Sequence, residues 1–292
     1  MASVVIVNKH EAWLAQTLDA IGPPGEGNLA REIVVVDASA GALDWIRARH
    51  PQVRWIDFEP RHQGAITIAH QRNIGVRAAT GDVIVFTDSG CIPEDHWLER
   101  LLAPIIEQGE SVTCGPARAG APSIYSGARW WGSTTSQYVN EAATINLAFR
   151  RGLFDAVGGF DESFGAAEDL DFTWRLRRAG YRLRWVPDAV VCPQWGGLER
   201  QLRRSLAYGR GWARLLRKHR RQIPSVVVQK PVPFVYPLFI LGLPLAWKWR
   251  AYPALLLLPL WRARREARPW LIVVDHLVLG AGVLMELVAP GK

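Results

Sequence analysis

The sequence predicts an α/β protein with a doubly wound, mostly parallel mixed sheet, followed by a basic amphipathic segment and apolar C-terminal helices. Over roughly the first 110 residues, apolar runs that end in a polar residue alternate with helical stretches. Acidic residues directly follow one of these apolar runs, at the carboxyl end of a predicted strand, where open α/β sheets bind ligands. Further acidic residues begin a later helix. Beyond residue 201, Arg and Lys dominate and long apolar runs appear. These three observations separate a sheet domain from an appended region.

The strands of the first part are predicted at residues 2–8, 32–37, 53–58 and 83–88, with helices at residues 10–21 and 66–79. From residue 111 to 195 the pattern is mixed, and short strands are predicted at residues 111–114, 144–149 and 183–186. A helix opens at Glu168 and stops before Gly180, a natural C-terminal glycine. The Gly/Ser-rich aromatic stretch 123–137 is predicted to be a loop that either closes over a ligand or packs Trp130 and Trp131 into the core.

Length and composition suggest one large domain plus an appendage, because the chain has 292 residues and 49% of them are hydrophobic. We expect three parts, at residues 1–195, 196–230 and 231–292. The three cysteines are an odd number without a CxxC motif, so reduced structural thiols are expected rather than disulfides or zinc. Residues 1–7 fit a first strand better than a secretion signal, because they lack a positive n-region.

The chain has a net charge of +8, and its basic segment lies beside an apolar region. This combination favours an anionic lipid surface over nucleic acid as the binding partner of the basic segment. Residues 234–247 and 252–261 are shorter than a membrane span and are predicted to be interfacial or re-entrant. Residues 270–289 have spanning length but carry Asp275 and Glu286, which are costly in hydrocarbon. A buried helical hairpin is the soluble alternative. The flanking Lys and Arg residues favour a cell-membrane location with the sheet domain on the cytoplasmic side.

Five segments, read in order, resemble an inverting family 2 glycosyltransferase of the membrane-associated type, with the nucleotide-sugar-binding GT-A fold. They are residues 4–8 (VVIVN), 34–39 (VVVDAS), 72–75 (RNIG), 81–88 (GDVIVFTD) and 158–162 (GGFDE) leading to 168–171 (EDLD). Each segment alone is a weak signal, but their shared order makes chance agreement unlikely. The resemblance covers roughly residues 1–195 and implies a hexosyltransferase that uses a nucleotide-diphosphate sugar as donor.

The resemblance implies that a set of strand-end, helix and linker residues contacts the nucleotide sugar: Val7, Asn8, Asp37, Arg72, Asn73, Asp88, Ser89, Asn146, Arg203 and Arg204. Other interpretations stay open for several of them. Asp37 could cap a turn, Arg72 could be a solvated helix charge, and Asn146 could close a buried turn. Arg203 and Arg204 could bind the diphosphate and so partly replace a metal ion, or they could face lipid instead.

Asp88 matches the first carboxylate of the family's DxD motif, which implies a divalent cation, Mg²⁺ or Mn²⁺, between protein and diphosphate. Gly90 stands where the second Asp would be and cannot supply a ligand. The family often has a His near residues 190–192, where this chain reads Cys192-Pro193-Gln194. The resemblance therefore implies an ion held weakly through Asp88, or replaced by cationic side chains.

Asp169 matches the family's catalytic base, which removes the proton from the acceptor hydroxyl during inversion. Glu168 would orient the acceptor or the base. Acids in a first helical turn also complement the helix dipole without any catalytic role. The acceptor is expected to be lipid-linked or part of the cell envelope, an expectation based on the apolar tail, and the oligomeric state is left open.

Two other functions are compatible with parts of the sequence. A catalytically silent glycosyltransferase-like module that binds a nucleotide or a partner is suggested by Gly90 and the absent His, while Glu168 and Asp169 argue for an enzyme. A nucleotidyltransferase would carry a Gly-rich loop with Lys or Arg after the first strand, and residues 8–11 (NKHE) do not resemble one.

Overall fold

The structure is a computed structural model that describes residues 1–25, 29–59, 67–118, 137–264 and 268–289. The chain divides into two compact units. Unit 1 comprises Met1–Gly120, Trp130–Ser163 and Glu168–Gln194, and unit 2 comprises Ala121–Arg129, Phe164–Ala167 and Trp195–Lys292. The three-part division expected from the sequence stays a prediction. The predicted loop at 123–137 lies, except for Gln137, outside the described residues.

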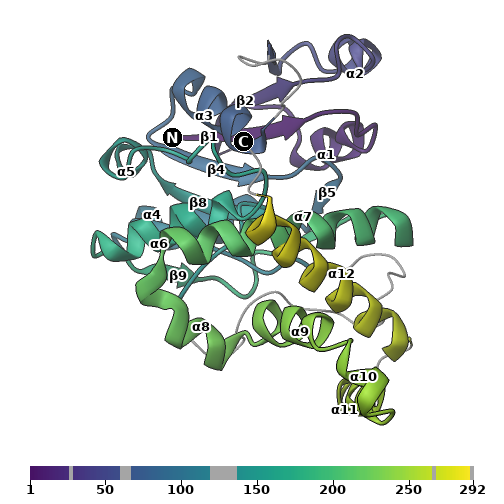
Figure 1. The fold of residues 1–292 in the computed structure, drawn as a ribbon. Helices are drawn as coiled ribbons and strands as arrows, with labels where there is room; N and C mark the ends of the chain where they lie inside the picture. The colour runs from purple at the N-terminus through teal and green to yellow at the C-terminus, as the bar shows by residue number, and fades with distance from the viewer. Residues whose placement is uncertain (26–28, 60–66, 119–136, 265–267, 290–292) are drawn as a thin grey trace. The chain divides into compact units, whose positions relative to one another are not determined.

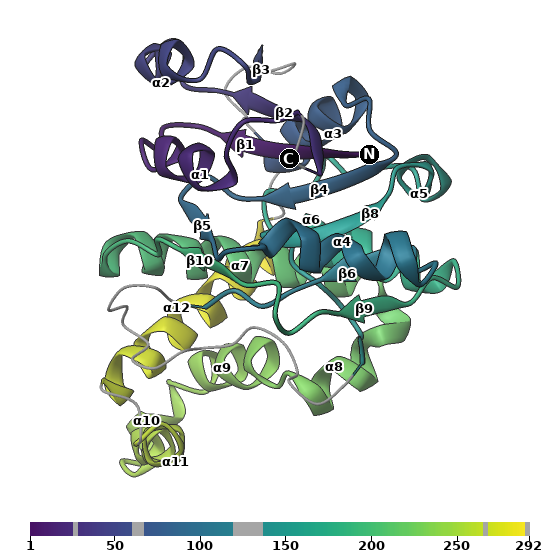
Figure 2. The same ribbon diagram turned by 180° about the vertical axis from the view of Figure 1, so that it is seen from behind.

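Unit 1 is built on an eight-stranded mixed sheet of order β3-β2-β1-β4-β8-β6-β9-β7 (Figures 1 and 2). Its strands are β1 (Ala2–Asn8), β2 (Ala30–Asp37), β3 (Arg54–Asp57), β4 (Val83–Thr87), β6 (Val112–Cys114), β7 (Tyr138–Val139), β8 (Asn146–Arg150) and β9 (Leu183–Trp185). The first four strands are parallel, and β8 is antiparallel to both β4 and β6. This confirms the predicted doubly wound, mostly parallel mixed sheet.

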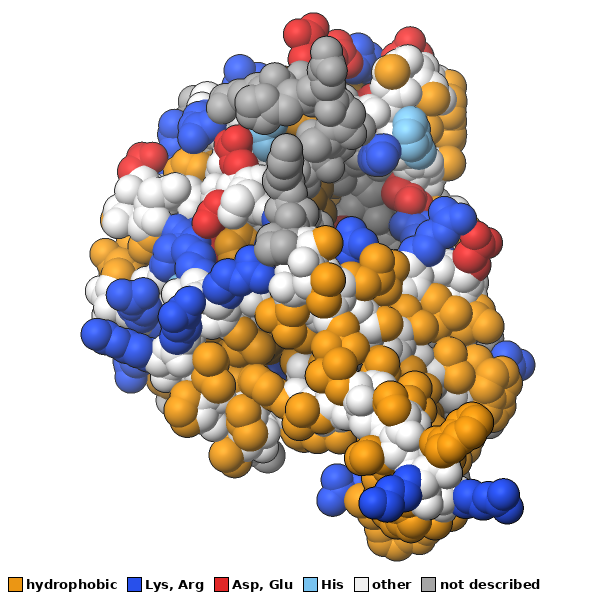
Figure 3. All heavy atoms as spheres, viewed as in Figure 1, with side chains coloured by type: hydrophobic (Ala, Val, Ile, Leu, Met, Phe, Trp, Pro, Cys, Tyr) orange, Lys and Arg blue, Asp and Glu red, His pale blue; other side chains and the backbone are white. Residues whose placement is uncertain are grey.

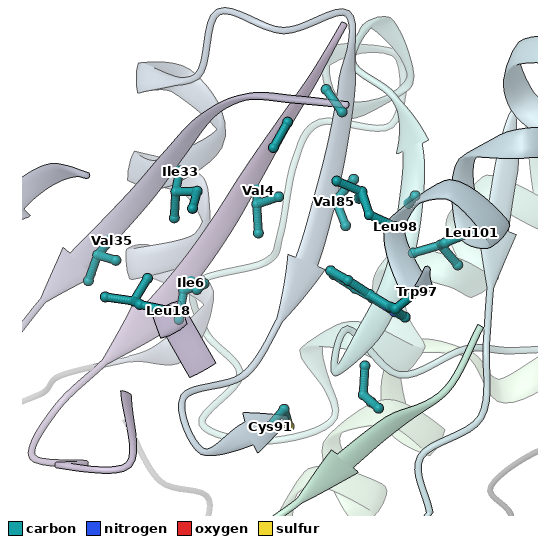
Figure 4. Packing of buried hydrophobic residues seen from close by; sticks show 14 of the residues in the cluster. Val4, Ile6, Leu18, Ile33, Val35, Val85, Cys91, Trp97, Leu98 and Leu101 are labelled. Atoms are coloured by element: carbon teal, nitrogen blue, oxygen red, sulfur yellow. The ribbon is translucent and has the colours of Figure 1, made fainter. Parts of the chain in front are cut away.

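Helices cover both faces of this sheet. They are α1 (Leu14–Ile21), α2 (Asp44–Arg49), α3 (Ile68–Ala78), α4 (Trp97–Glu107), α5 (Gly152–Ala156) and α6 (Glu168–Arg178). One core joins β1, β2 and β4 to α1, α2 and α4, and Figure 4 shows Leu18 and Trp97 packed against Val4, Ile6 and Val85. The opposite core joins the same sheet to α3, α5 and α6 through side chains such as Val76 and Phe172. Alternate residues of β1 therefore enter different cores, which explains its uninterrupted apolar sequence.

The sheet gathers polar residues at the carboxyl ends of its parallel strands. Asn8, the last residue of β1, pairs in register with Asp37, the last residue of β2. Asp88 follows β4 directly, and β4 lies on the other side of β1. Three predicted site residues are thus brought to one edge of the sheet by parallel register alone.

The secondary structure described for unit 2 is helical. It contains α7 (Leu198–Lys218), a 3-10 turn η1 (Arg220–Gln222), α8 (Ile223–Gln229), α9 (Val232–Leu241), α10 (Leu245–Lys248), a 3-10 turn η2 (Tyr252–Leu256), α11 (Leu257–Arg262) and α12 (Pro269–Val288). In the described part of the chain, α12 is the one helix long and apolar enough to cross a bilayer by itself. Residues Arg220–Gln229 with Val232–Leu241 would make a second span only as a pair bent by 87°.

Most predicted elements are confirmed within a few residues, and the differences have local causes. The helix predicted from residue 10 begins at Leu14, because Asn8 accepts a hydrogen bond from the Glu11 N–H and residues 9–13 form turns. The segment 234–247 is divided into α9 and α10 at Pro244. Helix α4 was not predicted, although its apolar positions have helical spacing. A small two-stranded sheet of β5 (Cys91–Pro93) and β10 (Val191–Pro193) was not predicted either.

Candidate active site

A buried polar cluster fixes the ends of β1 and β2. The Asp37 carboxylate accepts hydrogen bonds from the Ser39 backbone N–H at 3.1 Å and from the Ser39 hydroxyl at 2.6 Å. The Asn8 amide donates to Asp37 Oδ1 at 3.4 Å. Both side chains are buried. Asp37 therefore has the geometry of a turn-capping Asp, and its contact with a nucleotide stays a prediction.

Two hydrogen bonds connect the end of β1 to the loop after β4 and to α3. The Ser89 hydroxyl donates to the Val7 carbonyl oxygen at 2.8 Å, and the Gln71 amide donates to the Asn8 carbonyl oxygen at 3.0 Å. Because Gln71 belongs to α3, these bonds hold α3 and both strand ends in one arrangement. The predicted binding residues Val7, Asn8 and Ser89 therefore lie close together.

Arg72 of α3 is the centre of the site. Its guanidinium is buried and pairs with the carboxylate of Glu168, the first residue of α6, and with Asp88 Oδ1 at 3.3 Å. The rings of Phe86 and Phe160 flank it, each with its centroid 5.8 Å from the guanidinium carbon. Burial by itself would lower the pKa of Arg72, but the negative charges of Glu168, Asp88 and Asp169 outweigh burial and raise it.

This arrangement decides between two interpretations that the sequence left open for Arg72. Arg72 is not a solvated helix charge, because its side chain pairs with Asp88 and Glu168, which lie 16 and 96 positions away in the chain. The aromatic neighbours Phe86 and Phe160 were not predicted as part of the site.

Asp169 carries the most perturbed carboxyl group of the site. Burial, reinforced by the negative charge of Glu168, raises its pKa to about 7, although Arg72 and a hydrogen bond from the Leu170 N–H act in the opposite direction. A carboxylate with a pKa near neutrality can accept a proton and release it again at physiological pH. Neighbouring Asp171 has another role, because it is fully buried and pairs with Arg175 at 2.8 Å.

Asp88 is the candidate protein ligand for a divalent cation. The Asp88 side chain is 38% exposed, so it can be approached from solvent. Within the described residues, no three or more His, Cys, Asp and Glu side chains cluster in a way that could hold a metal ion. Mg²⁺ commonly binds through one or two carboxylates together with substrate phosphates and water. Asp88 fits such an ion only if the diphosphate supplies other ligands.

The backbone explains why a second Asp is absent. Gly90 has φ = 83°, a conformation that L-residues adopt at a cost, and a Cβ there would lie 3.2 Å from the Trp13 Cβ. The Gly90 N–H donates to the Thr17 hydroxyl at 2.9 Å, and its carbonyl accepts from the Gln194 N–H at 2.9 Å. Gln194, which follows β10, thus connects β10 to the loop after β4.

Asn73 and Asn146 both make structural hydrogen bonds. Asn73 donates to the Phe160 carbonyl oxygen at 2.9 Å and accepts from the Phe160 N–H at 2.8 Å. Asn146 donates to the carbonyl oxygens of Pro116 and Ala189 and accepts from Trp97 Nε1 at 2.9 Å. Asn146 has the buried geometry that its alternative interpretation describes, and contact of either residue with a sugar stays a prediction.

Arg203 and Arg204 lie on α7 in unit 2. Arg203 is exposed and pairs with Glu199 at 2.6 Å, whereas Arg204 donates to the Trp195 carbonyl oxygen at 2.6 Å and stacks over the Trp195 ring. These contacts lie within unit 2. Their approach to a diphosphate stays a prediction.

Comparisons with protein families and curated proteins agree on one kind of relative. The model described as "Glycosyl transferase family 2" matches residues 3–159, and "Glycosyl transferase family group 2" matches residues 128–285. The chain is 27% identical to Glycosyltransferase AglE of Haloferax volcanii over 161 residues, covering 53% of this chain and 52% of AglE. It is 34% identical to the Pre-mycofactocin glycosyltransferase of Mycobacterium tuberculosis, covering 55% of this chain and 37% of that protein. The chain therefore spans about half or less of these two relatives.

A longer match and two solved structures extend the comparison. The Succinoglycan biosynthesis protein ExoA of Rhizobium meliloti is 28% identical over 275 residues, covering 87% of this chain and 76% of ExoA. The mannosyltransferase PcManGT of Pyrobaculum calidifontis, solved with GDP-Man and Mn²⁺, has a TM-score of 0.68 at 19% identity and covers 99% of this chain and 88% of its own. GalNAc-T7, solved with UDP, GalNAc and Mn²⁺, has a TM-score of 0.53, also at 19% identity, and covers 72% and 50%. These structures confirm the predicted GT-A fold.

Proposed function

Because the chain belongs to glycosyl transferase family 2, we propose that it transfers a sugar from a nucleotide-diphosphate sugar to a hydroxyl acceptor, with inversion at the anomeric carbon. The observation that carries this proposal is Asp169, a carboxyl group with a pKa of about 7 beside the buried Arg72–Glu168 pair. Several relatives are named glycosyltransferases, which supports the same reaction class.

Asp169 acts in this proposal as the base. Its carboxylate takes the proton of the acceptor hydroxyl while the hydroxyl oxygen forms a bond to the anomeric carbon. The bond from that carbon to the diphosphate oxygen breaks, and its electron pair leaves with the nucleoside diphosphate. Glu168 holds Arg72 in place and keeps the pKa of Asp169 high, so that the proton is accepted readily near neutral pH.

The donor is proposed to bind at the carboxyl ends of β1, β2 and β4, with Asp37 near the nucleoside and Asp88 near the diphosphate. A divalent cation, Mg²⁺ or Mn²⁺, would neutralise charge on the departing diphosphate, with Asp88 as its protein ligand. The Mn²⁺ in the two solved structures of the same fold supports this part of the proposal. Arg72 supplies a fixed positive charge beside Asp88 in either case.

The acceptor is proposed to be lipid-linked or part of the cell envelope, with the enzyme at the cytoplasmic side of the membrane. The exposed apolar side chains of unit 2 and the similarity to a succinoglycan biosynthesis protein support this choice.

Calorimetric titration with UDP, GDP and dTDP, each with Mg²⁺, Mn²⁺ or EDTA, tests donor binding. We expect one nucleotide to bind in a metal-dependent way and Asp88→Ala to abolish the metal dependence. Asp155→Ala, which removes an exposed carboxylate on α5, is the matched control and should bind normally.

Gly90 in place of the second Asp is also compatible with a catalytically silent binding module. Measurement of sugar transfer distinguishes an enzyme from such a module. Asp169→Asn should bind the nucleotide as the wild type does and lose transfer. Nucleotide binding without transfer by the wild-type protein to any lipid-linked or glycan acceptor would favour the silent module, and absence of nucleotide binding would refute both.

A further inference from the structure

The exposed surface of unit 2 carries an unusual set of side chains. Figure 3 shows hydrophobic side chains gathered over α9 to α12 and cations at the tip formed by α10 and α11. The exposed large apolar residues in these helices and the turns between them are Val235, Leu238, Leu241, Leu243, Leu245, Trp247, Trp249, Leu255, Leu257, Leu258, Trp261, Trp270, Met285, Leu287 and Val288. Trp247 is 96% exposed. Monomeric soluble proteins rarely expose a continuous apolar surface of this kind.

The exposed apolar side chains follow from the packing of α9. Tyr236 and Pro237 are buried against α12, where Tyr236 Oη lies 3.3 Å from His276 Nδ1. Val235, Leu238 and Leu241 lie on the opposite face, three residues apart, and are exposed. The helix therefore turns an apolar stripe outward, which is the reverse of a soluble surface helix.

The tip packs on α9 and is cationic. Tyr252 of η2 stacks on Phe239 with ring centroids 5.2 Å apart and donates a hydrogen bond to the Phe239 carbonyl oxygen at 2.9 Å. Lys248, Arg250 and Arg262 are exposed beside the tip's tryptophans. The sequence from residue 231 to 264 contains no Asp or Glu. Trp with Lys or Arg around an apolar surface matches the headgroup region of an anionic bilayer.

Helix α12 cannot be surrounded by lipid along its length. Its Asp275 accepts hydrogen bonds from Ser205 and Gln201 of α7, and its Glu286 pairs with Arg214 at 2.7 Å. Between these contacts the backbones touch, because a Cβ on Gly209 would overlap the Leu279 carbonyl oxygen, and one on Gly282 would overlap that of Leu206.

Helix α7 also carries cations over the length that contacts α12: Arg200, Arg203, Arg204, Arg210, Arg214, Arg217 and Lys218. Insertion of α12 across a bilayer would carry α7 and these charged side chains into hydrocarbon, which is strongly unfavourable even for charges that have a partner.

We propose that unit 2 binds the surface of an anionic lipid bilayer, with α9, α10 and α11 lying in the interface and α12 not crossing the membrane. The occupant of the apolar surface is lipid, because the cations and tryptophans complement its headgroups. Both ends of unit 2 then lie on the same side of the membrane. This inference is independent of the transfer reaction.

Vesicle binding by the full-length protein tests the lipid partner. We expect sedimentation with phosphatidylcholine vesicles that contain phosphatidylglycerol, and weaker binding at high salt. Lys248→Gln/Arg250→Gln/Arg262→Gln should weaken binding to these vesicles about a hundredfold, since each cation near an anionic surface contributes about fivefold. The control Arg77→Gln/Arg177→Gln/Arg178→Gln removes three exposed cations of unit 1 and should bind as the wild type does.

Trp247→Ala/Trp261→Ala should lower the affinity about tenfold for vesicles with or without phosphatidylglycerol. Trp45→Ala, an exposed tryptophan on α2, is the matched control. Nucleotide titration of every variant shows whether unit 1 remains folded. Equal binding by wild type and tip variants, no binding to either vesicle, or a stable dimer that shields Trp247 would each overturn the proposal.

The membrane topology of the protein tests the second part of the proposal, that α12 does not cross the bilayer. A C-terminal tag should be accessible on the same side of native membranes as unit 1, and alkaline carbonate should release the protein. Retention after carbonate with the tag on the opposite side would show that α12 spans the bilayer and would overturn the proposal.

Discussion

Replacement of Asp169 by Asn should stabilise the protein, and increasingly so as pH rises. The rise of its pKa from the ordinary 3.8 to about 7 means that the folded state holds a proton which the unfolded chain releases between these two values. An acid with a raised pKa therefore costs stability as pH increases through this window, and the cost is complete above about pH 7. The full cost is about 4 kcal/mol at 1.36 kcal/mol per pKa unit, and we expect about 2–4 kcal/mol because the carboxyl is partly exposed.

The neutral Asn avoids this cost while its Oδ1 can still accept the Leu170 N–H. At about 3 °C per kcal/mol for a domain of this size, thermal unfolding at pH 8 should shift upward by about 6–12 °C. At pH 4 the shift should disappear. Thermal melts followed by circular dichroism between pH 4 and pH 8 measure it, with Asp155→Asn as a control for the loss of one exposed charge. A difference between wild type and Asp169→Asn that stays constant or decreases with pH would refute the argument that burial and Glu168 hold the pKa of Asp169 high.

Three further predictions concern the same unit. The kcat/KM for the donor should rise between pH 5 and 8 with a midpoint at about 7, because Asp169 accepts a proton only when it is ionised, and a flat profile would contradict the base assignment. Gly90→Asp and Gly90→Ala should both lower the stability by about 1–2 kcal/mol in urea unfolding, because of the positive φ and the Trp13 contact, and an unchanged midpoint for either would argue against strain at Gly90. Asn73→Ala should cost about 2–4 kcal/mol, since it leaves the Phe160 backbone groups without partners, and a variant that folds normally but binds no nucleotide would show a direct binding role instead.

The parts of the site that depend on local pattern are predictable from the sequence. An apolar run followed by a polar residue identifies a strand end, and the ends of neighbouring parallel strands meet at one edge of the sheet. In the structure Asn8 and Asp37 end β1 and β2, and Asp88 directly follows β4, so the three residues share that edge. The start of α6 at Glu168 follows from its acidic first turn and from Gly180 at its end.

The parts that depend on long-range packing were not predictable. Arg72 receives its partners from β4 and α6, and nothing in the sequence around it shows that both reach it. The family resemblance implies that Asn146 contacts the sugar, whereas its hydrogen bonds to the carbonyl oxygens of Pro116 and Ala189 depend on distant segments of the chain meeting there. The sequence of the apolar C-terminal region shows how long each apolar segment is, but not which helix packs against which. The pairing of Asp275 and Glu286 with residues of α7 is seen only in the structure.

The pairing of α7 with α12 has a practical consequence for preparing this protein. A shortened chain that ends before α12 would expose the face of α7 that approaches α12 closely at Gly209, and it would remove Glu286, the ion-pair partner of Arg214. Such a truncation should aggregate rather than give a well-behaved sample. Polar substitution of outward side chains such as Leu238, Trp247 and Leu257 keeps the helix pair whole, and it is the better route to crystals or spectra without detergent.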